Sequence, residues 1–214
     1  MRVSEIMTKD VATVTEESSL NKAFKILHER RHKVLPVMRG ERLAGLLSEK
    51  LLAEVRPSKA TSLSVYEINY LMSRTKVRDI MIKDVQTTSP TALVEEAALV
   101  MYNNDIGSLP VVEADKTIVG IITQTDIFKA FVGLMGVDHK GTRLSLSVPD
   151  DVGMLAKISR TVADAGFNIS HISNYARGGG KRNIVLRIDT FNADGLVDMI
   201  KNAGVDVSSV QVFQ

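Results

Sequence analysis

An internal repeat is the feature of this sequence that most constrains its fold. Three segments of the first copy recur in the same order in the second: Val3–Val11 as Val77–Val85, Leu35–Val37 as Leu109–Val111, and Gly45–Ser48 as Gly120–Thr123. Two copies this regular indicate a duplicated supersecondary unit, which cannot bury its apolar face alone. We therefore expect the two copies to pack against each other.

Each copy has the element order of a small α+β unit. A short strand precedes a helix, which follows a cap at Ser18 or Ser19 in the first copy and at Ser89 with Pro90 in the second. Leu-Pro-Val then opens a strand, a turn leads to another strand, and a final helix ends the copy. The order β-α-β-β-α leaves an apolar sheet face, so we predict packing about a pseudo-twofold axis.

The end of the second copy, Gly120–Asp126, has the most informative chemistry. A buried strand leads directly into a helix, with Thr123 at the turn. A hydroxyl there can cap the helix, and the free amides attract anions. Asp126 offers two oxygens to neighbouring hydroxyls such as those of a ribose. This predicts a nucleotide site at Gly120, Ile121, Thr123 and Asp126, although the same spacing also fits a capping box.

The first copy retains the cap but not the acid. Leu51 stands where the second copy has Asp126, three residues after Ser48. Ser48 can still cap its helix, but no carboxylate remains for a ribose. We therefore predict one competent site and one degraded site, the latter at Ser48 and Leu51.

These motifs resemble the CBS-domain family in its tandem form, the Bateman module, over residues 1–132. The resemblance divides this part into CBS repeat 1 (1–55), a connector with a helix (56–76) and CBS repeat 2 (77–132). It implies an adenine nucleotide, such as AMP, ATP, NAD or S-adenosylmethionine, in a cleft between the repeats. It also implies that the partner repeat forms the other cleft wall, here His32 and Lys33, with positive charge beside a polyphosphate.

His28–His32 matches the His-Glu-x-x-His pattern of zinc proteases. The corresponding residues of the second copy, Tyr102–Ile106, cannot bind zinc, although the repeat predicts the same fold there. We therefore predict a solvated basic helix end and no metal site.

The C-terminal third has a different pattern, after a linker at 133–141. Residues 142–214 show alternating and amphipathic segments in the order β-α-β-β-α-β, which is ferredoxin-like. Gly178–Arg182 lacks the Ser or Thr that follows the lysine of a phosphate loop, so we expect it to form a hairpin tip. The predicted fold class of the whole chain is therefore α+β.

Asp150-x-x-Gly153-x-Leu155, followed by Gly166–Ile169, resembles the ACT domain, a small-molecule sensor of amino-acid metabolism. The resemblance implies a ligand site at Asp150, Val152, Gly153, Met154, Asn168 and Ile169. Gly153 would let the backbone approach a ligand carboxylate at the helix N-terminus, and Asn168 could bond both ends of an amino acid. A structural turn in a purely dimerising domain is the alternative.

A CBS pair followed by ACT is similar to the acetoin-utilisation accessory protein (AcuB) family.

Composition narrows the class of function. The chain has no cysteine, a net charge of only +2, and four scattered histidines without a nucleophile–base pair. It lacks a basic stripe, a signal-peptide core and a bilayer-length apolar run, so we expect a cytoplasmic protein without nucleic-acid or membrane partners.

We predict a non-catalytic regulatory sensor that forms a homodimer or higher homo-oligomer. The resemblance implies a metabolic enzyme partner in acetoin or related carbon metabolism; a dimerisation adaptor with vestigial pockets is the alternative.

Overall fold

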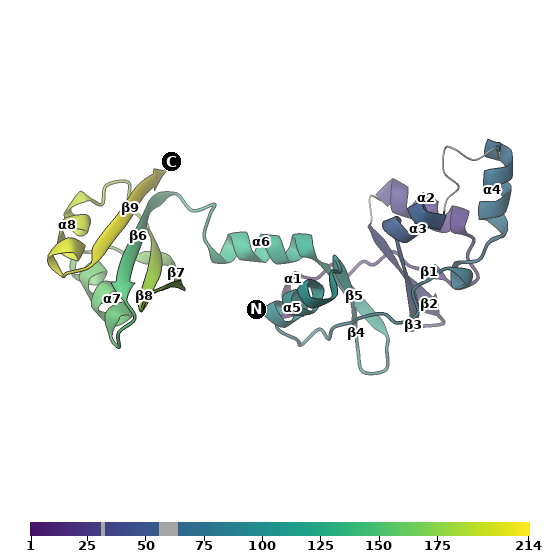
Figure 1. The fold of residues 1–214 in the computed structure, drawn as a ribbon, viewed down its shortest axis with the longest axis horizontal. Coiled ribbons are helices and arrows are strands. Elements are labelled where there is room, and N and C mark those ends of the chain that lie inside the picture. The colour runs from purple at the N-terminus through teal and green to yellow at the C-terminus, as the bar shows by residue number, and fades with distance from the viewer. Residues whose placement is uncertain (31–32, 56–63) are drawn as a thin grey trace. The chain divides into compact units, whose positions relative to one another are not determined.

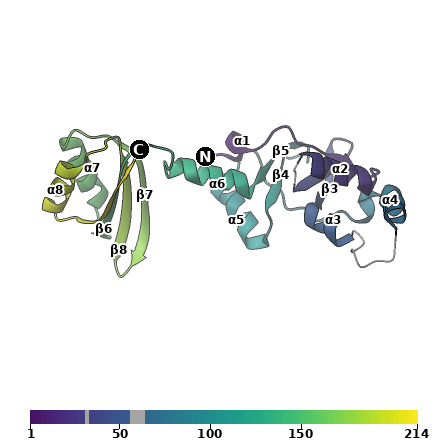
Figure 2. The same ribbon diagram turned by 90° about the horizontal axis from the view of Figure 1, so that it is seen from above.

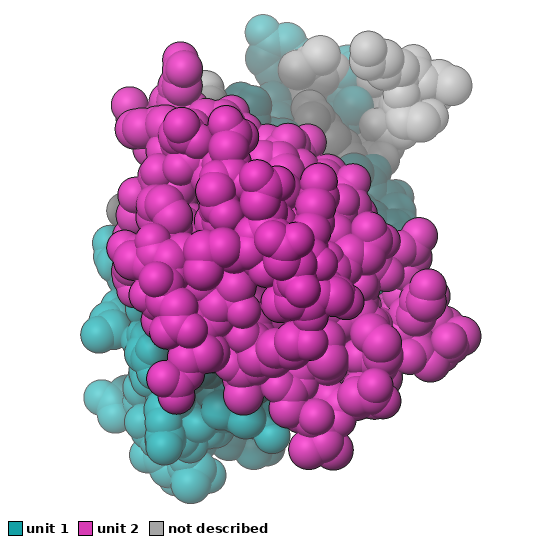
Figure 3. Space-filling view, turned by 90° about the vertical axis from the view of Figure 1, so that its left-hand side faces the viewer, with its two compact units in different colours: residues 1–128 teal, residues 129–214 magenta. Residues whose placement is uncertain are grey.

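A computed structural model describes residues 1–30, 33–55 and 64–214 of the 214-residue chain. The chain divides into two compact units, Met1–Phe128 and Lys129–Gln214 (Figure 3). The first unit contains both repeats, and the second contains the ferredoxin-like domain. None of the helices in the described ranges is both long enough and apolar enough to cross a membrane.

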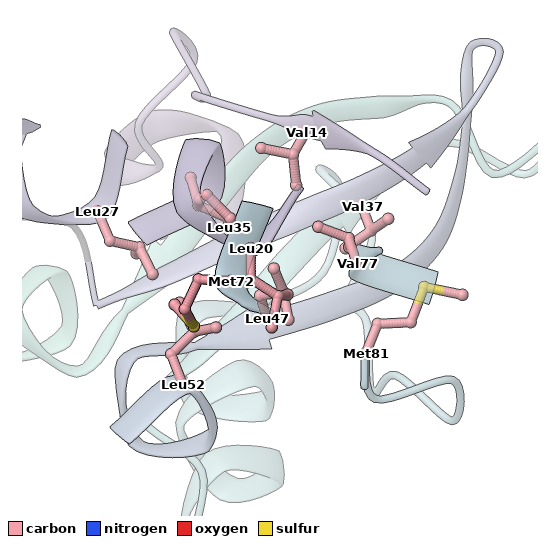
Figure 4. Close-up of a cluster of buried hydrophobic side chains, with 11 residues drawn as sticks. Val14, Leu20, Leu27, Leu35, Val37, Leu47, Leu52, Met72, Val77 and Met81 are labelled. Atoms are coloured by element: carbon pink, nitrogen blue, oxygen red, sulfur yellow. The ribbon is translucent and has the colours of Figure 1, made fainter. Parts of the chain in front are cut away.

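The first repeat has a three-stranded sheet packed against helices (Figure 1). Its elements are α1 (Val3–Ile6), β1 (Val14–Thr15), α2 (Leu20–Arg30), β2 (Val34–Arg39), β3 (Arg42–Ser48) and α3 (Glu49–Val55). β1 pairs in parallel with β2, which pairs in antiparallel fashion with β3. Leu20, Ala23 and Leu27 recur at helical spacing, so one face of α2 is buried. The connector helix α4 (Val65–Arg74) adds Met72 to the same core (Figure 4).

The second repeat follows the same order. Its elements are the 3-10 turn η1 (Val77–Asp79), α5 (Val94–Asn104), β4 (Ser108–Val112), β5 (Ile118–Thr123) and α6 (Gln124–Leu134). A single parallel bridge between Thr88 and Val111 takes the place of β1. The predicted repeat order is therefore confirmed, with one addition. A helical turn, α1 or η1, opens each repeat, and the sequence pattern did not indicate it.

The first segment of each repeat packs into the core of the other repeat. Val3 is fully buried in the apolar cluster of the second repeat, whereas Val77 and Met81 join that of the first (Figure 4). Backbone hydrogen bonds of 2.9 Å run in both directions between Thr8 and Ile121. Matching bonds, also of 2.9 Å, join the corresponding pair in the other repeat, Ile82 and Leu46. The duplicated segments are thus exchanged symmetrically.

Two equivalent glycines make this exchange possible. A Cβ added to Gly45 would lie 2.6 Å from Met81 Sδ and 2.9 Å from the carbonyl oxygen of Ile82. A Cβ added to Gly120 would lie 2.5 Å from Met7 Sδ. Each Ile-Met of the repeat therefore covers the glycine of the opposite copy, which explains why these motifs are duplicated together.

The second unit is a four-stranded antiparallel sheet covered on one face by two helices (Figure 2). Its elements are β6 (Gly141–Pro149), α7 (Met154–Asp164), β7 (Ile169–Gly178), β8 (Lys181–Ile188), α8 (Asp194–Asn202) and β9 (Asp206–Phe213). The strand order is β7-β8-β6-β9. Alternate residues of β6, Leu144, Leu146 and Val148, are buried in the core that includes side chains of both helices. The predicted ferredoxin-like order is confirmed, and the three glycines at 178–180 lie at the turn of the β7–β8 hairpin.

Replacing Gly45 with alanine tests whether the close approach of the exchanged segment is required. We expect Gly45→Ala to lower the free energy of unfolding by about 1–3 kcal/mol, because the new methyl group would overlap Met81 and the backbone of Ile82. Urea unfolding followed by circular dichroism measures this change. Gly133→Ala is the matched control, since a Cβ at Gly133 in α6 meets no atom within 4 Å. Equal stability of the two variants would contradict the prediction.

Candidate nucleotide and ligand sites

The corner between β5 and α6 is a complete capping box. Thr123 donates from its backbone N and from Oγ1 to Asp126 Oδ2, at 2.8 and 2.7 Å. The backbone N of Asp126 donates in return to Thr123 Oγ1 at 3.4 Å. Both side chains are half-buried, and no group in the described part of the chain bonds the other carboxylate oxygen, Oδ1. The acid therefore caps the helix and still presents one unoccupied oxygen at the corner.

The equivalent corner of the first repeat has the cap alone. Ser48 Oγ accepts a hydrogen bond of 3.0 Å from the backbone N of Leu51. The side chain of Leu51 packs against the first apolar cluster and offers no hydrogen-bonding group at the corner. The two corners therefore have the same backbone arrangement and differ in chemistry at one position.

The strand that leads to the second-repeat corner lies beneath the exchanged segment. Gly120 is buried against Met7, and Ile121 forms the bridge with Thr8. Met7 and Thr8 are therefore neighbours of the corner that motif reasoning missed. The duplicated Ile-Met motif was the sequence signal for these neighbours. The sequence alone does not show that each copy of the motif contacts the opposite repeat.

The residue before β2 lies beside the corner of its own repeat. The backbone N of Glu49 donates to the Lys33 carbonyl at 2.8 Å, and that of Gln124 donates to the Gly107 carbonyl at 3.0 Å. The Lys33 side chain is exposed. Within the described ranges, no hydrogen bond or ion pair joins Lys33 to Asp126, and His32 lies outside them. The role of these two residues as a second cleft wall stays a prediction.

A charged hollow of about 400 Å³ lies between the first repeat and the opening segment of the second repeat, and sequence reasoning did not find it. It is lined by Glu16, Arg39, Ala44, Arg78, Asp79, Met81 and Lys83. Arg39 donates to both oxygens of Glu16, at 2.6 and 2.7 Å. These hydrogen bonds are the main cause that lowers the pKa of Glu16, with Arg78 and Lys83 acting in the same direction. Because Arg78 also pairs with Glu17 and Asp79, the charges in this hollow largely compensate one another.

A second hollow, also of about 400 Å³, opens on the helix-covered side of the other unit. It is lined by Val148, Pro149, Asp150, Asp151, Gly153, Met154, Leu155, Ala156, Asn174, Arg182 and Ile184. Gly153 has φ +90° and precedes the first turn of α7, a conformation that favours glycine. Arg182 Nη1 lies 3.3 Å from Asp150 Oδ2, and its Nε donates to Asn174 Oδ1 at 2.6 Å. Among the residues predicted for this site, Asp150, Gly153 and Met154 lie together here.

The other predicted ligand residues of this domain lie elsewhere. The Val152 side chain is fully exposed, and Asn168 donates to Asp189 Oδ2 at 3.3 Å. Ile169 packs against the helix-covered core. Arg182 and Asn174 were missed because their place in the hollow depends on how the hairpin folds back beside α7.

Of the segment with the zinc-protease pattern, His28, Glu29 and Arg30 form the end of α2. His28 stacks on Phe24 with ring centroids 6.1 Å apart, and His32 lies outside the described residues. Within the described ranges, no three side chains of His, Cys, Asp or Glu are grouped to hold a metal ion.

Comparison with known proteins identifies both parts of the chain. The CBS domain model matches residues 3–57 and 77–133, and the TTHA0829-like ACT domain model matches residues 140–211. An uncharacterised protein of Methanocaldococcus jannaschii is 29% identical over 132 residues, which are 61% of this chain and 44% of the relative. Homoserine O-acetyltransferase of Methanohalobium evestigatum is 30% identical over 126 residues, 58% of this chain and 23% of the enzyme. The chain therefore spans less than half the length of these curated relatives.

Solved structures of CBS pairs are similar to the first unit. A Vibrio cholerae protein assigned to acetoin utilisation (AcuB) is 26% identical, with a TM-score of 0.53, and the match covers 64% of this chain and 95% of that one. The CBS pair of protein MJ0100, solved with 5'-methylthioadenosine and S-adenosylmethionine, is 25% identical, with a TM-score of 0.51 and coverages of 62% and 97%. CBSX2, solved with AMP, is 25% identical, with a TM-score of 0.52 and coverages of 62% and 96%. The chain belongs to the CBS-domain family, as a tandem CBS pair followed by an ACT domain.

Proposed function

We propose that this protein is a non-catalytic regulatory sensor that binds an adenine nucleotide at the corner formed by Thr123 and Asp126. The observation that carries the proposal is the difference between the two repeats. Both retain the helix cap, but only the second retains a carboxylate at the third position, with one oxygen available. A capping role alone does not explain this difference, because Ser48 caps its helix without an acid.

The chemistry of the corner fits a nucleotide. Asp126 Oδ1 accepts one ribose hydroxyl, and Oδ2 can exchange its Thr123 partner for the other. The backbone N atoms of Gln124 and Asp126 already have partners, so the positive end of the α6 dipole is what favours a phosphate there. Related CBS pairs bind adenine-containing ligands, as the MJ0100 and CBSX2 complexes illustrate, and this supports an adenine nucleotide as the ligand of the present chain.

Regulation requires a nucleotide to stabilise one arrangement of the protein over another. α6 begins at the proposed site and ends at Leu134 in the second unit, so one helix is common to both units. A homo-oligomer that modulates a metabolic enzyme partner is the form of sensor we propose. The link to acetoin or related carbon metabolism rests on the similarity to AcuB. The alternative is a dimerisation adaptor with vestigial pockets. Nucleotide binding by the wild-type protein would exclude it, and absence of binding would support it.

Calorimetric titration with AMP, ATP, NAD and S-adenosylmethionine tests the nucleotide site. We expect the wild-type protein to bind at least one of them, and Asp126→Ala to weaken that binding about 10- to 150-fold, because hydrogen bonds to a charged group contribute about 1.5–3 kcal/mol. Ser48→Ala is the matched control, since it removes the cap of the first repeat and should leave the affinity unchanged. Absence of binding by the wild type, or equal binding by Asp126→Ala, would refute the assignment.

A second ligand site, for an amino acid, is favoured by the hollow beside α7. Arg182 and the first amides of α7 suit a carboxylate, and Asp150 suits an amine. Gly153 allows the backbone to turn there, and Asn174 orients the Arg182 side chain. The placement of Asn168 outside the lining makes Arg182 the better residue to test.

A screen of amino acids by thermal shift, followed by calorimetry, tests this site. We expect Arg182→Gln to weaken amino-acid binding about tenfold or more through loss of a charge-assisted pair, while nucleotide binding is unaffected. Arg160→Gln, an exposed position on α7, controls for the change in net charge. If no amino acid binds, or if Arg182→Gln binds as well as Arg160→Gln, the domain is dimerising rather than sensing.

A further inference from the structure

The face of the second unit's sheet that α7 and α8 leave uncovered has a row of four polar residues, three of them basic. In the register across the four strands, the row consists of His171 on β7, Arg187 on β8, Arg143 on β6 and Gln211 on β9. Arg143 and Arg187 are directly opposite each other on neighbouring strands. Like charges in this position destabilise a sheet. A negatively charged group between the two arginines would reduce this repulsion.

Arg187 is buried without a counter-ion. Its exposed fraction is only 8%, its Nε donates to the Met135 carbonyl at 2.8 Å, and its guanidinium lies 5.0 Å from the centroid of the Phe213 ring. Over the described ranges, no carboxylate lies within 4 Å of the guanidinium, and no acceptor bonds either Nη group. Burial lowers the pKa of Arg187, and so does Arg143, whereas Asp138 acts in the opposite direction. An unpaired buried charge is costly, and proteins normally pair such groups.

Further hydrogen-bonding groups without partners lie beside this arginine pair. The next row of the same face consists of Ser173, Val185, Ser145 and Ser209. His171 Nδ1 and Ser173 Oγ are the buried side-chain atoms without a partner in the described part of the chain. Arg143 Nη1 donates to Ser145 Oγ at 2.7 Å and to Gln211 Oε1 at 3.3 Å, which holds it at the centre of the face. This face therefore has several hydrogen-bond donors, and none of them bonds a carboxylate in the described part of the chain.

We propose that this face binds a small oxyanion, a phosphate or carboxylate group, between Arg143 and Arg187. Two adjacent guanidinium groups present planar forks that match the oxygens of such an anion. A bound anion also offsets the repulsion between the two arginines and supplies the missing counter-charge. Asp206, opposite Ser147 on β9, is an acidic residue on this face, but it forms no ion pair with either arginine in the described ranges.

The linker restricts the occupant to a small group. Met135 bonds Arg187 directly, and the following residue, Gly136, is buried so closely against His171 that an added Cβ would overlap the imidazole ring. With only 8% of Arg187 exposed, a protein surface has little access to its guanidinium. A second copy of the face would also bring two further arginines, and Asp206 as its acid lies opposite Ser147 rather than beside Arg143 and Arg187. The site is separate from the amino-acid hollow. The strand register places Arg182 and Asn174 on the opposite, helix-covered face of the sheet.

Titration of the full-length protein with inorganic phosphate, sulfate and succinate tests the proposal, at constant ionic strength. We expect saturable binding of at least one anion by calorimetry, and the phosphate and succinate arms show which oxyanion the site prefers. Arg143→Gln should reduce the affinity at least tenfold, because it removes one of the two forks. It should also raise the melting temperature of the anion-free protein, since the opposed charge is gone. Arg160→Gln, which removes the same charge from α7, should change neither quantity.

The outcomes that overturn the proposal are specific. They are absence of saturable binding, equal weakening by Arg160→Gln, or a lower anion-free melting temperature in Arg143→Gln. Amide chemical shifts give a second measurement on the wild-type protein. Changes centred on Arg143, Ser145, His171, Ser173 and Arg187 support the site, and changes centred on the α7 hollow overturn it. AMP titration of Arg143→Gln keeps this result separate from the nucleotide proposal, because AMP affinity should be retained.

Discussion

The exchange of the first segments between the two repeats is the constraint on which the first unit depends. Met7 covers Gly120, and Met81 covers Gly45, at distances that exclude a side chain on either glycine. Each repeat lacks part of its own core and completes that of its partner, so neither apolar cluster is complete within one copy. Close packing makes such an arrangement sensitive to a single methyl group.

A symmetric scaffold of this kind makes chemical differences between its halves informative. The corners at Ser48 and Thr123 share strand, turn, helix and cap, so the fold does not require a different residue three positions later. Leu51 contributes to the apolar core, whereas Asp126 presents a carboxylate oxygen. Only the second arrangement suits a ribose. The proposed sensor therefore has one nucleotide site, although both repeats have the capped corner.

The second unit places different chemistry on the two faces of one sheet. The helix-covered face includes the hollow with Arg182, where an acid and an amide already balance the cation. The other face includes Arg143 and Arg187, which are opposed to each other and, in the described ranges, form no ion pair with a carboxylate, although Asp138 partly offsets the charge of Arg187. The same residue type is thus central to the proposed amino-acid pocket on one face and to the proposed oxyanion site on the other.

The sequence by itself determined the duplication, the order of the elements and the loss of the acid at Leu51, because these depend on local periodicity and on comparison of two copies in one chain. It also located Asp150, Gly153 and Met154, since all three belong to one turn. Only the tertiary structure decided that Met7 and Met81 cross to the opposite repeat, that Arg182 reaches the hollow, and that Arg187 is buried opposite Arg143. Each of these depends on strand register or chain exchange, which bring together residues far apart in sequence. Local patterns contain no information about such pairings.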